Sequence, residues 1–159
     1  MSEETPIQPV APVATEAAQA TPVIAPAKPD RGGFYWGTGR RKAAVARVRI
    51  RPGTGKYLLN GREVNNYFTE ERDQQKVRLP LVETNTAEKL DVFINIHGGG
   101  YMGQAGAALL GVARALLKYD PSLEPILRDK NLLSRDSRRV ERKKYGQPGA
   151  RKRFQFSKR

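Results

Sequence analysis

Cysteine is absent from the 159-residue chain, and histidine occurs only once, as His97. The first absence excludes disulfide bonds, thiol nucleophiles and cysteine-ligated zinc, and it fits a protein of the reducing cytosol. A single histidine cannot form a metal site or a catalytic triad alone. Zinc chemistry that depends on cysteine and triad chemistry that depends on a second histidine are therefore excluded.

Long apolar runs are also missing. No stretch approaches the roughly 20 apolar residues that span a bilayer. Residues 1–30 lack both the basic start and the apolar core of a secretory signal. The basic segments have no apolar face opposite their charges, which a membrane-binding helix requires. We therefore expect no membrane partner.

Acidic residues are few compared with basic ones. The chain carries 29 Lys and Arg against 16 Asp and Glu, with a net charge of +13 and a sequence pI of about 10.3. Residues 128–159 hold thirteen bases and three acids, whereas residues 1–30 hold one base and four acids. This balance favours a polyanionic partner, and nucleic acid is the commonest one.

The composition divides the chain into three parts. Residues 1–33 are rich in proline and alanine without helical or strand periodicity, so we interpret them as a disordered leader with no essential role. Residues 34–127 contain the periodic segments of a globular domain. Residues 128–159 form a basic tail with too few apolar side chains to order itself. Its Phe154 and Phe156 are suited to stack on bases.

Several segments have the periodicity of regular structure. In residues 42–51 and 88–97, apolar side chains alternate with polar ones, which indicates strands with one buried face. Helical spacing in residues 101–119 predicts a helix that ends at Asp120-Pro121. The remaining expected elements are a strand at 57–59 and helical segments at 64–68, 121–127 and 135–146, while 69–80 is ambiguous. The expected fold is α+β, a small sheet with helices on one side.

The helix expected at residues 135–146 is unusual. It is short and carries like-charge pairs at i,i+4, Arg138 with Arg142 and Arg139 with Lys143, which weaken an isolated helix. We therefore expect an anionic partner to hold it.

A glycine run, Gly98 to Gly100, joins the second alternating segment to the long helix. HGGG also occurs in esterase oxyanion holes, but that chemistry needs a G-x-S-x-G elbow and a second histidine, which the chain lacks. The run also lacks the G-K-[ST] of a P-loop. Two compatible interpretations remain: free N–H groups at the helix start bind an RNA phosphate, or glycine permits a tight turn. Gly106, Ala107 and Gly111 are small enough for the helix to lie close against the sheet.

Three arginines, Arg47, Arg49 and Arg51, share one face of the first alternating segment. They are spaced roughly 6.6 Å apart and repel one another, which favours an anionic strand alongside over an ordinary solvated face. Arg40, Arg41 and Lys42 directly precede this row, and we expect them to extend the same patch. We interpret this surface as an RNA contact.

Four motifs follow one another over residues 36–159: GTGRRKAAVARVRIRPGTGKYLLNGR, HGGGYMGQAGAALLGVARALL, LLSRDSRRVERKKYG and the closing RFQFSKR. Together they resemble the bacterial-type family of the ninth protein of the small ribosomal subunit. Two features depart from that family's pattern. The leader is absent from its shorter members, and Pro148 and Gly149 interrupt the charge of the tail.

The resemblance implies an α+β fold like that of the second domain of the fifth small-subunit protein, with an unusual left-handed β-α-β crossover. It implies a structural role in the subunit head, bound to the 3′ major domain of the small-subunit rRNA and beside neighbouring head proteins. It also implies that the tail threads through RNA to the P site, where Lys158 and Arg159 contact the anticodon stem-loop of the tRNA. No cofactor, metal or catalytic residue is implied. The expected location is the cytoplasm, or an organelle with bacterial-type ribosomes.

On the matching motifs we expect rRNA contacts from the basic strand, the glycine turn and the tail. These residues are Arg40, Arg41, Lys42, Arg47, Arg49, Arg51, Gly98, Gly99, Gly100, Gln104, Arg138, Arg139, Arg142, Lys143, Lys144, Arg151, Lys152 and Arg153. One alternative is a free-standing RNA-binding protein or RNA chaperone. Another is a small phosphate-transferring enzyme, which is disfavoured because the sequence places no base or metal cluster.

Overall fold

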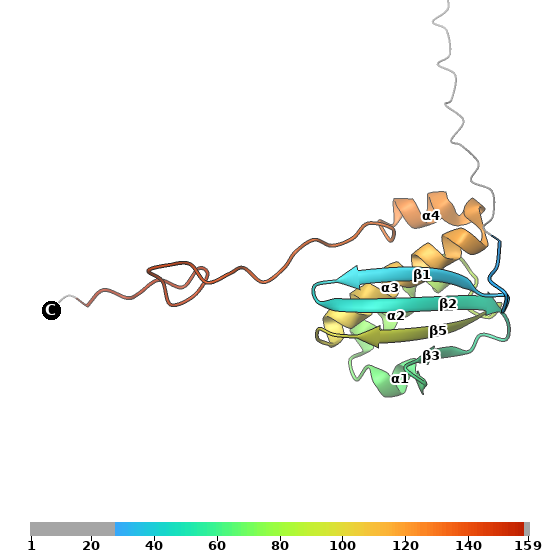
Figure 1. Cartoon of the computed structure of the whole chain (residues 1–159), viewed down its shortest axis with the longest axis horizontal. Helices are drawn as coiled ribbons and strands as arrows, with labels where there is room; N and C mark the ends of the chain where they lie inside the picture. Colours follow the sequence, from blue (N-terminus) through green and yellow to red (C-terminus); the bar gives the residue numbers. More distant parts are fainter. Residues whose placement is uncertain (1–27, 158–159) are drawn as a thin grey trace, which may run out of the picture.

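The computed structural model describes residues 28–157, so Lys158, Arg159 and residues 1–27 of the expected leader lie outside the described residues. A five-stranded sheet carries the helices on one face, and a long tail leaves the domain (Figure 1). The strands are β1 (Tyr35–Arg41), β2 (Ala44–Pro52), β3 (Tyr57–Leu59), β4 (Arg62–Glu63) and β5 (Leu90–His97). The helices are α1 (Val64–Tyr67), α2 (Glu71–Glu83), α3 (Tyr101–Tyr119), the 3-10 turn η1 (Pro121–Leu123) and α4 (Glu124–Asp129). The expected α+β class is confirmed.

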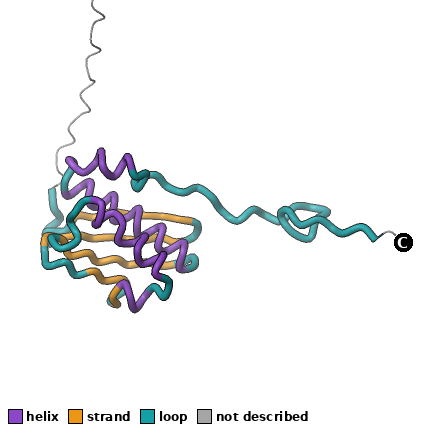
Figure 2. Tube along the Cα trace, turned by 180° about the vertical axis from the view of Figure 1, so that it is seen from behind, coloured by secondary structure: helices purple, strands orange, loops and turns teal. Residues whose placement is uncertain are grey.

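The sheet has the order β1-β2-β5-β3-β4. β2 pairs antiparallel with β1 and β5, β3 pairs parallel with β5, and β4 is a short antiparallel edge on β3. α2 and α3 lie behind the strands in Figure 1 and in front of them in Figure 2, whereas α4 lies beyond the β1 edge and α1 near the β3 edge. In Figure 1, β3 and β5 both run to the left, β5 lies above β3, and the connection through α1 and α2 passes behind. This crossover is therefore left-handed, against the usual rule.

The alternating pattern of β2 and β5 builds the core, as expected. The buried face of β2 is made of Ala44, Ala46, Val48 and Ile50, each at most 1% exposed. The strand begins at Ala44, so the prediction that it begins at Lys42 is wrong. Lys42 lies instead in the two-residue turn between β1 and β2, at φ +52°.

β1 has no alternation of large apolar residues, because its buried positions are glycines. Gly37 and Gly39 face α3: a Cβ on Gly37 would lie 2.2 Å from the carbonyl oxygen of Gly111, and one on Gly39 would lie 1.9 Å from that of Ala107. The backbones of β1 and α3 therefore touch without intervening side chains. The expectation that Ala107 and Gly111 allow close packing is confirmed, with β1 as the partner.

α2 occupies most of the stretch that is ambiguous in the sequence. Its first half is polar and Pro80 lies inside it, so no long apolar stripe marks it as a helix. Val77 and Leu81, one turn apart, are 0% and 3% exposed. The hydroxyl of Tyr57 donates a hydrogen bond to the carbonyl oxygen of Val77 at 3.0 Å. Packing against the core, more than local pattern, thus holds α2.

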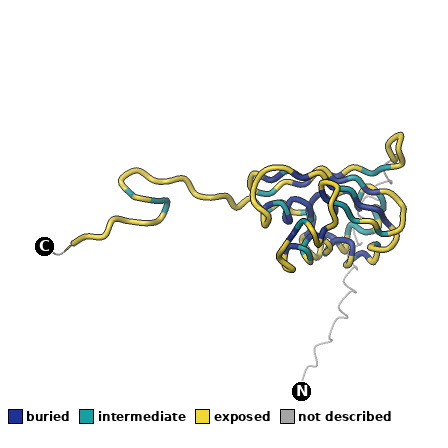
Figure 3. Tube along the Cα trace, turned by 90° about the horizontal axis from the view of Figure 1, so that it is seen from below, coloured by how far each residue is buried: buried dark blue, intermediate teal, exposed yellow. Residues whose placement is uncertain are grey.

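The helix predicted at residues 135–146 is wrong. The chain leaves the core after Leu132, which is 4% exposed, and residues 135–144 have no regular structure. The like-charge pairs at i,i+4 disfavour a helix, and no apolar face compensates, since Val140 is 89% exposed. Figure 3 shows nearly the whole tail exposed.

Within residues 28–157, no helix is long and apolar enough to cross a bilayer.

Candidate nucleic-acid interface

The sheet face that the helices leave free carries the arginine row. Arg47, Arg49 and Arg51 alternate with the buried residues of β2, and Arg40 on β1 lies opposite Val45. Residues directly opposite in an antiparallel pair share a face, so Arg40 lies on the same side as the row. We call these four residues the outer-face arginines. Arg40, Arg47 and Arg51 are exposed, and Arg49 is half-buried.

Two aromatic rings order half of this set. Phe34 and Phe93 meet edge to face with centroids 6.1 Å apart. The guanidinium carbons of Arg49 and Arg51 lie between 5.3 and 5.5 Å from both centroids. Such contacts contribute about 0.5–1 kcal/mol at exposed sites. Sequence reasoning missed this cluster, although Phe93 is an aromatic residue at a position where the alternation calls for a polar one.

Asp91 is the acid built into this face, opposite Arg51. It is 4% exposed and accepts hydrogen bonds from the backbone N–H groups of Thr54 at 2.9 Å and Lys56 at 3.1 Å, and from Arg51 Nε at 3.4 Å. Burial alone would raise the pKa of Asp91, but these hydrogen bonds outweigh it and lower the pKa below its ordinary value. Asp91 therefore fixes the turn after β2 and partly neutralises Arg51.

Arg41 does not extend the row, because it lies opposite Ala44 on the helix-covered face. Its Nη2 donates to Asp136 Oδ2 at 2.8 Å, and its Nη1 points to the carbonyl oxygen of Met102 at 3.5 Å. Arg138 donates to the same carboxylate, at 2.9 Å from Nη2 and 3.0 Å from its backbone N. These bonds, those of Arg138 first, hold the pKa of Asp136 well below its usual range. Arg41, Asp136 and Arg138 tie the base of the tail to the sheet, and we call them the tail anchor.

A cleft of about 230 Å³ lies beside the tail anchor. Lys76 lines it together with Arg41, and burial followed by the charge of Arg41 lowers the pKa of Lys76. Gly106 also lines it, and a Cβ there would lie 2.3 Å from Arg41 Cδ. Gly106 therefore makes room for the Arg41 side chain, a role that the sequence pattern does not reveal. Arg41 Nε is buried without a hydrogen-bond partner in the described part of the chain.

The glycine turn is required by the backbone. Gly98 and Gly99 have φ values of +74° and +67°, a region that disfavours other residues. A Cβ on Gly98 would also lie 2.7 Å from the carbonyl oxygen of Ala43, in the turn between β1 and β2. Gly100 is the N-cap of α3 and has no side-chain cap. The tight-turn interpretation thus has direct support, and phosphate binding at the helix start stays a prediction.

Gln104 holds this turn in place. Its Nε2 donates to the carbonyl oxygen of Gly98 at 3.2 Å, and its Oε1 accepts from the hydroxyl of Tyr67 at 2.8 Å. His97 is exposed at the end of β5. Within residues 28–157, no group of three or more His, Cys, Asp or Glu side chains could hold a metal ion.

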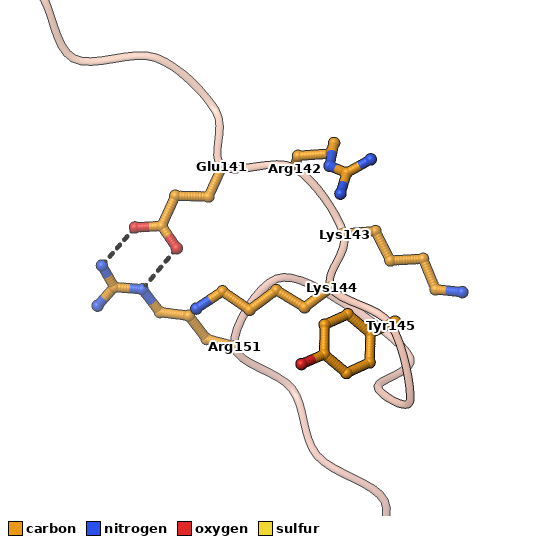
Figure 4. Close-up of a pocket in the computed structure, with 6 residues that line it drawn as sticks. All are labelled: Glu141, Arg142, Lys143, Lys144, Tyr145 and Arg151. Carbon is orange, nitrogen blue, oxygen red and sulfur yellow. Dashed lines mark hydrogen bonds and ion pairs between the residues drawn. The ribbon is translucent and has the colours of Figure 1, made fainter.

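The remaining expected contact residues are spread along the tail. Arg139, Arg142, Lys143, Lys144, Lys152 and Arg153 are exposed and lie away from the sheet (Figure 3). Arg151 is exposed too, but its guanidinium is hydrogen-bonded to Glu141 (Figure 4). The structure thus brings the outer-face arginines together and separates Arg41 from them. The basic residues of the tail form a second charged segment, away from the sheet.

Comparison with known proteins identifies the family. Residues 39–159 match the family described as ribosomal protein S9/S16. The small ribosomal subunit proteins uS9 of Anaeromyxobacter sp. (strain K) and of Anaeromyxobacter dehalogenans (strain 2CP-1) are each 54% identical to this chain over 121 residues, which are 76% of this chain and 93% of the relative. The match therefore covers β1 from Gly39 onward, the rest of the domain and the whole tail. The chain therefore belongs to the ribosomal protein S9/S16 family.

Proposed function

We propose that the chain is a structural constituent of the small subunit of the cytoplasmic ribosome and acts by holding RNA rather than by catalysis. Its family supports the ribosomal role, and the two relatives are named as small-subunit proteins. The observation that carries the proposal is how the positive charge is arranged. In a chain of net charge +13, a rigid sheet face and an extended tail present it separately (Figure 1).

The outer-face arginines form the first RNA-binding surface of this proposal. They lie on one rigid sheet face, and Phe34 and Phe93 restrain Arg49 and Arg51 there. Restrained cations lose less conformational freedom when they bind phosphate, which favours a fixed docking site. The proposed ligand is the head domain, the 3′ major domain, of the small-subunit rRNA, with neighbouring head proteins alongside.

The tail is the second surface. It leaves the domain at Asp136, and 23 residues lead from there to Arg159. Fully extended, they span at most roughly 80 Å. That length suits a tail which passes through rRNA and brings Lys158 and Arg159 to the anticodon stem-loop of a P-site tRNA. A charge-assisted hydrogen bond to phosphate contributes about 1.5–3 kcal/mol.

Small subunits assembled with a chain that ends at Ser157 test the tail contact. We expect normal incorporation, because the sheet face and the rest of the tail remain. P-site tRNA should bind roughly 10- to 100-fold more weakly, at 1.4 kcal/mol per tenfold. The control removes two charges from the domain instead, by Arg128→Gln with Lys130→Gln, residues that pair with Glu124 and Glu83. Equal tRNA dissociation constants for the truncated and intact subunits at one salt concentration would refute the contact.

Sedimentation of a lysate tests the ribosomal location itself. A subunit constituent co-migrates with small subunits and stays there at moderate salt. A free-standing RNA-binding protein or chaperone would instead spread through the light fractions, and that result would overturn the proposal.

A further inference from the structure

Beyond Asp136, one acidic residue stands among the basic residues of the tail, and a role in binding phosphate does not explain its presence. Among residues 137–159, Glu141 is the only acid beside ten bases. A carboxylate repels phosphate, so a tail that needed positive charge alone would be better without it. Glu141 instead pairs with Arg151, ten positions away: Arg151 Nε donates to Oε2 at 3.1 Å, and Nη2 donates to Oε1 (Figure 4). The two parallel bonds form a bidentate pair, the most directional form of this contact.

This pair closes a loop. Between Glu141 and Arg151 the chain reverses through Gly146, at φ +65°, and the Pro148-Gly149 step. The backbone N–H of Lys144 points to the carbonyl oxygen of Gly149 at 3.5 Å, across the turn. The Pro148-Gly149 step, which interrupts the tail's charge in the sequence, is therefore part of the turn that the ion pair closes.

The loop surrounds a concave space and presents an aromatic ring. Arg142, Lys143, Lys144 and Tyr145 line the space, about 620 Å³ in volume, together with the ion pair. Tyr145 is 96% exposed, so its ring contributes nothing to a core. In Figure 4 the Tyr145 ring lies beside Lys144 inside the turn, while Arg142 and Lys143 point outward. An exposed ring flanked by cations is the arrangement that binds an unpaired base and its phosphates.

We propose that the Glu141–Arg151 pair is a clasp that pre-forms a binding loop for single-stranded RNA, in which one base stacks on Tyr145 and adjacent phosphates contact Arg142 and Lys143. Arg151 is then a positioning residue, because its guanidinium holds Glu141. A loop closed in advance lowers the entropy lost on binding. This inference rests on the proposed function, since it names the RNA contact that part of the tail makes.

The test uses the full chain and an in vitro transcript of the 3′ major domain of small-subunit rRNA. Tyr145→Leu should weaken binding roughly 5- to 150-fold, the range for loss of one stacked base, whereas Tyr145→Phe keeps the ring and should match the wild type. Glu141→Gln should bind more weakly even though its net charge is higher by one. Exchange of the pair, Glu141→Arg with Arg151→Glu, should restore binding at unchanged net charge. The clasp is overturned if Glu141→Gln binds more tightly, or if Tyr145→Leu and Tyr145→Phe bind equally well.

The salt dependence separates positioning from direct contact. Arg142→Gln should reduce the slope of log K against log salt by about 0.7–0.9, one phosphate contact. Arg151→Gln should lower the affinity and leave that slope unchanged. If Arg151→Gln reduces the slope as Arg142→Gln does, Arg151 binds phosphate and the clasp is wrong. If the wild-type chain itself shows a slope near −1, the proposed RNA-binding function fails, and the clasp falls with it.

Discussion

The substitution Gly39→Ala tests the contact that sets the position of β1 on α3. An added Cβ would lie 1.9 Å from the carbonyl oxygen of Ala107 and 2.4 Å from the backbone N of Gly111. Both atoms belong to the backbone of α3 and cannot rotate away as a side chain can. An ordinary contact begins at about 3.4 Å, so β1 and α3 would have to separate locally by roughly 1.5 Å.

The cost follows from packing. Overpacking a core costs typically about 1–3 kcal/mol, and we expect the upper end because two backbone atoms are in the way. In a domain of this size, each kcal/mol shifts the melting temperature by roughly 4–8 °C, so the expected loss is roughly 12–24 °C. Thermal and guanidinium unfolding followed by circular dichroism measure it. RNA binding should weaken too, since β1 carries Arg40 on the outer face and Arg41 in the tail anchor.

Gly103→Ala provides a control of opposite sign. Gly103 lies in the first turn of α3, and a Cβ there meets the carbonyl oxygen of Arg41 at 3.7 Å and Ala44 Cβ at 3.8 Å, both ordinary contacts. Replacing a helical glycine by alanine should stabilise the domain by about 0.5–1 kcal/mol. If Gly39→Ala unfolds at the wild-type midpoint, or if the two variants shift it equally in one direction, the close contact between β1 and α3 is refuted.

Three further predictions concern charge and the leader. Arg47→Gln should reduce the salt slope of rRNA binding by about 0.7–0.9, while Arg128→Gln, whose charge pairs with Glu124, should leave it unchanged; equal slopes for both would contradict the outer-face contact. Asp91→Asn should destabilise the domain near neutral pH and lose this effect in acid: the folded pKa lies below the unfolded value of about 3.9, so the stabilisation exists above that value and is lost as pH falls through the folded pKa. Unfolding curves at several pH values check this, and a pH-independent difference would contradict it. Deletion of residues 1–27 should change stability by less than about 0.5 kcal/mol and leave subunit assembly intact, which melting and sedimentation measure; a larger change would show that this segment docks.

The parts of the fold that the sequence predicts are those with large buried side chains at regular spacing. Val48, Ile50 and Ile94 mark β2 and β5, and the apolar stripe marks α3. The sequence does not predict β1, because the close contact of its backbone with α3 depends on glycines, and glycine in a sequence equally indicates a turn. The sequence does not predict α2 either, because its buried residues are few and its stability comes from tertiary packing.

The candidate site was predictable in charge but not in orientation. Alternation correctly predicts that Arg47, Arg49 and Arg51 share a face, because the side-chain period of a strand is two. Alternation could not reveal that Arg41 lies on the helix-covered face. The position of the turn after β1 sets the register of β1 on β2, and this register decides which face each residue takes. Nor could alternation reveal the partners of Asp136 and Glu141, which lie 95 and 10 positions away. The helix expected at residues 135–146 failed for a related reason. Asp136 and Glu141 bind Arg41 and Arg151, which both lie outside that segment, and no apolar face is left to hold a helix.

The two faces of β1 carry arginines with different contacts. Arg40 and Arg41 are consecutive, so the pleat sends one to the free face and the other beneath α3. Arg40 remains exposed on the outer face, whereas the Arg41 side chain is 14% exposed and holds Asp136. The strand that carries Arg40 on the outer face therefore also fixes, through Arg41, where the tail begins. Since Gly39 and Gly106 make room for α3 and for Arg41 on that covered face, the close packing of the domain is what gives the basic tail a defined starting point.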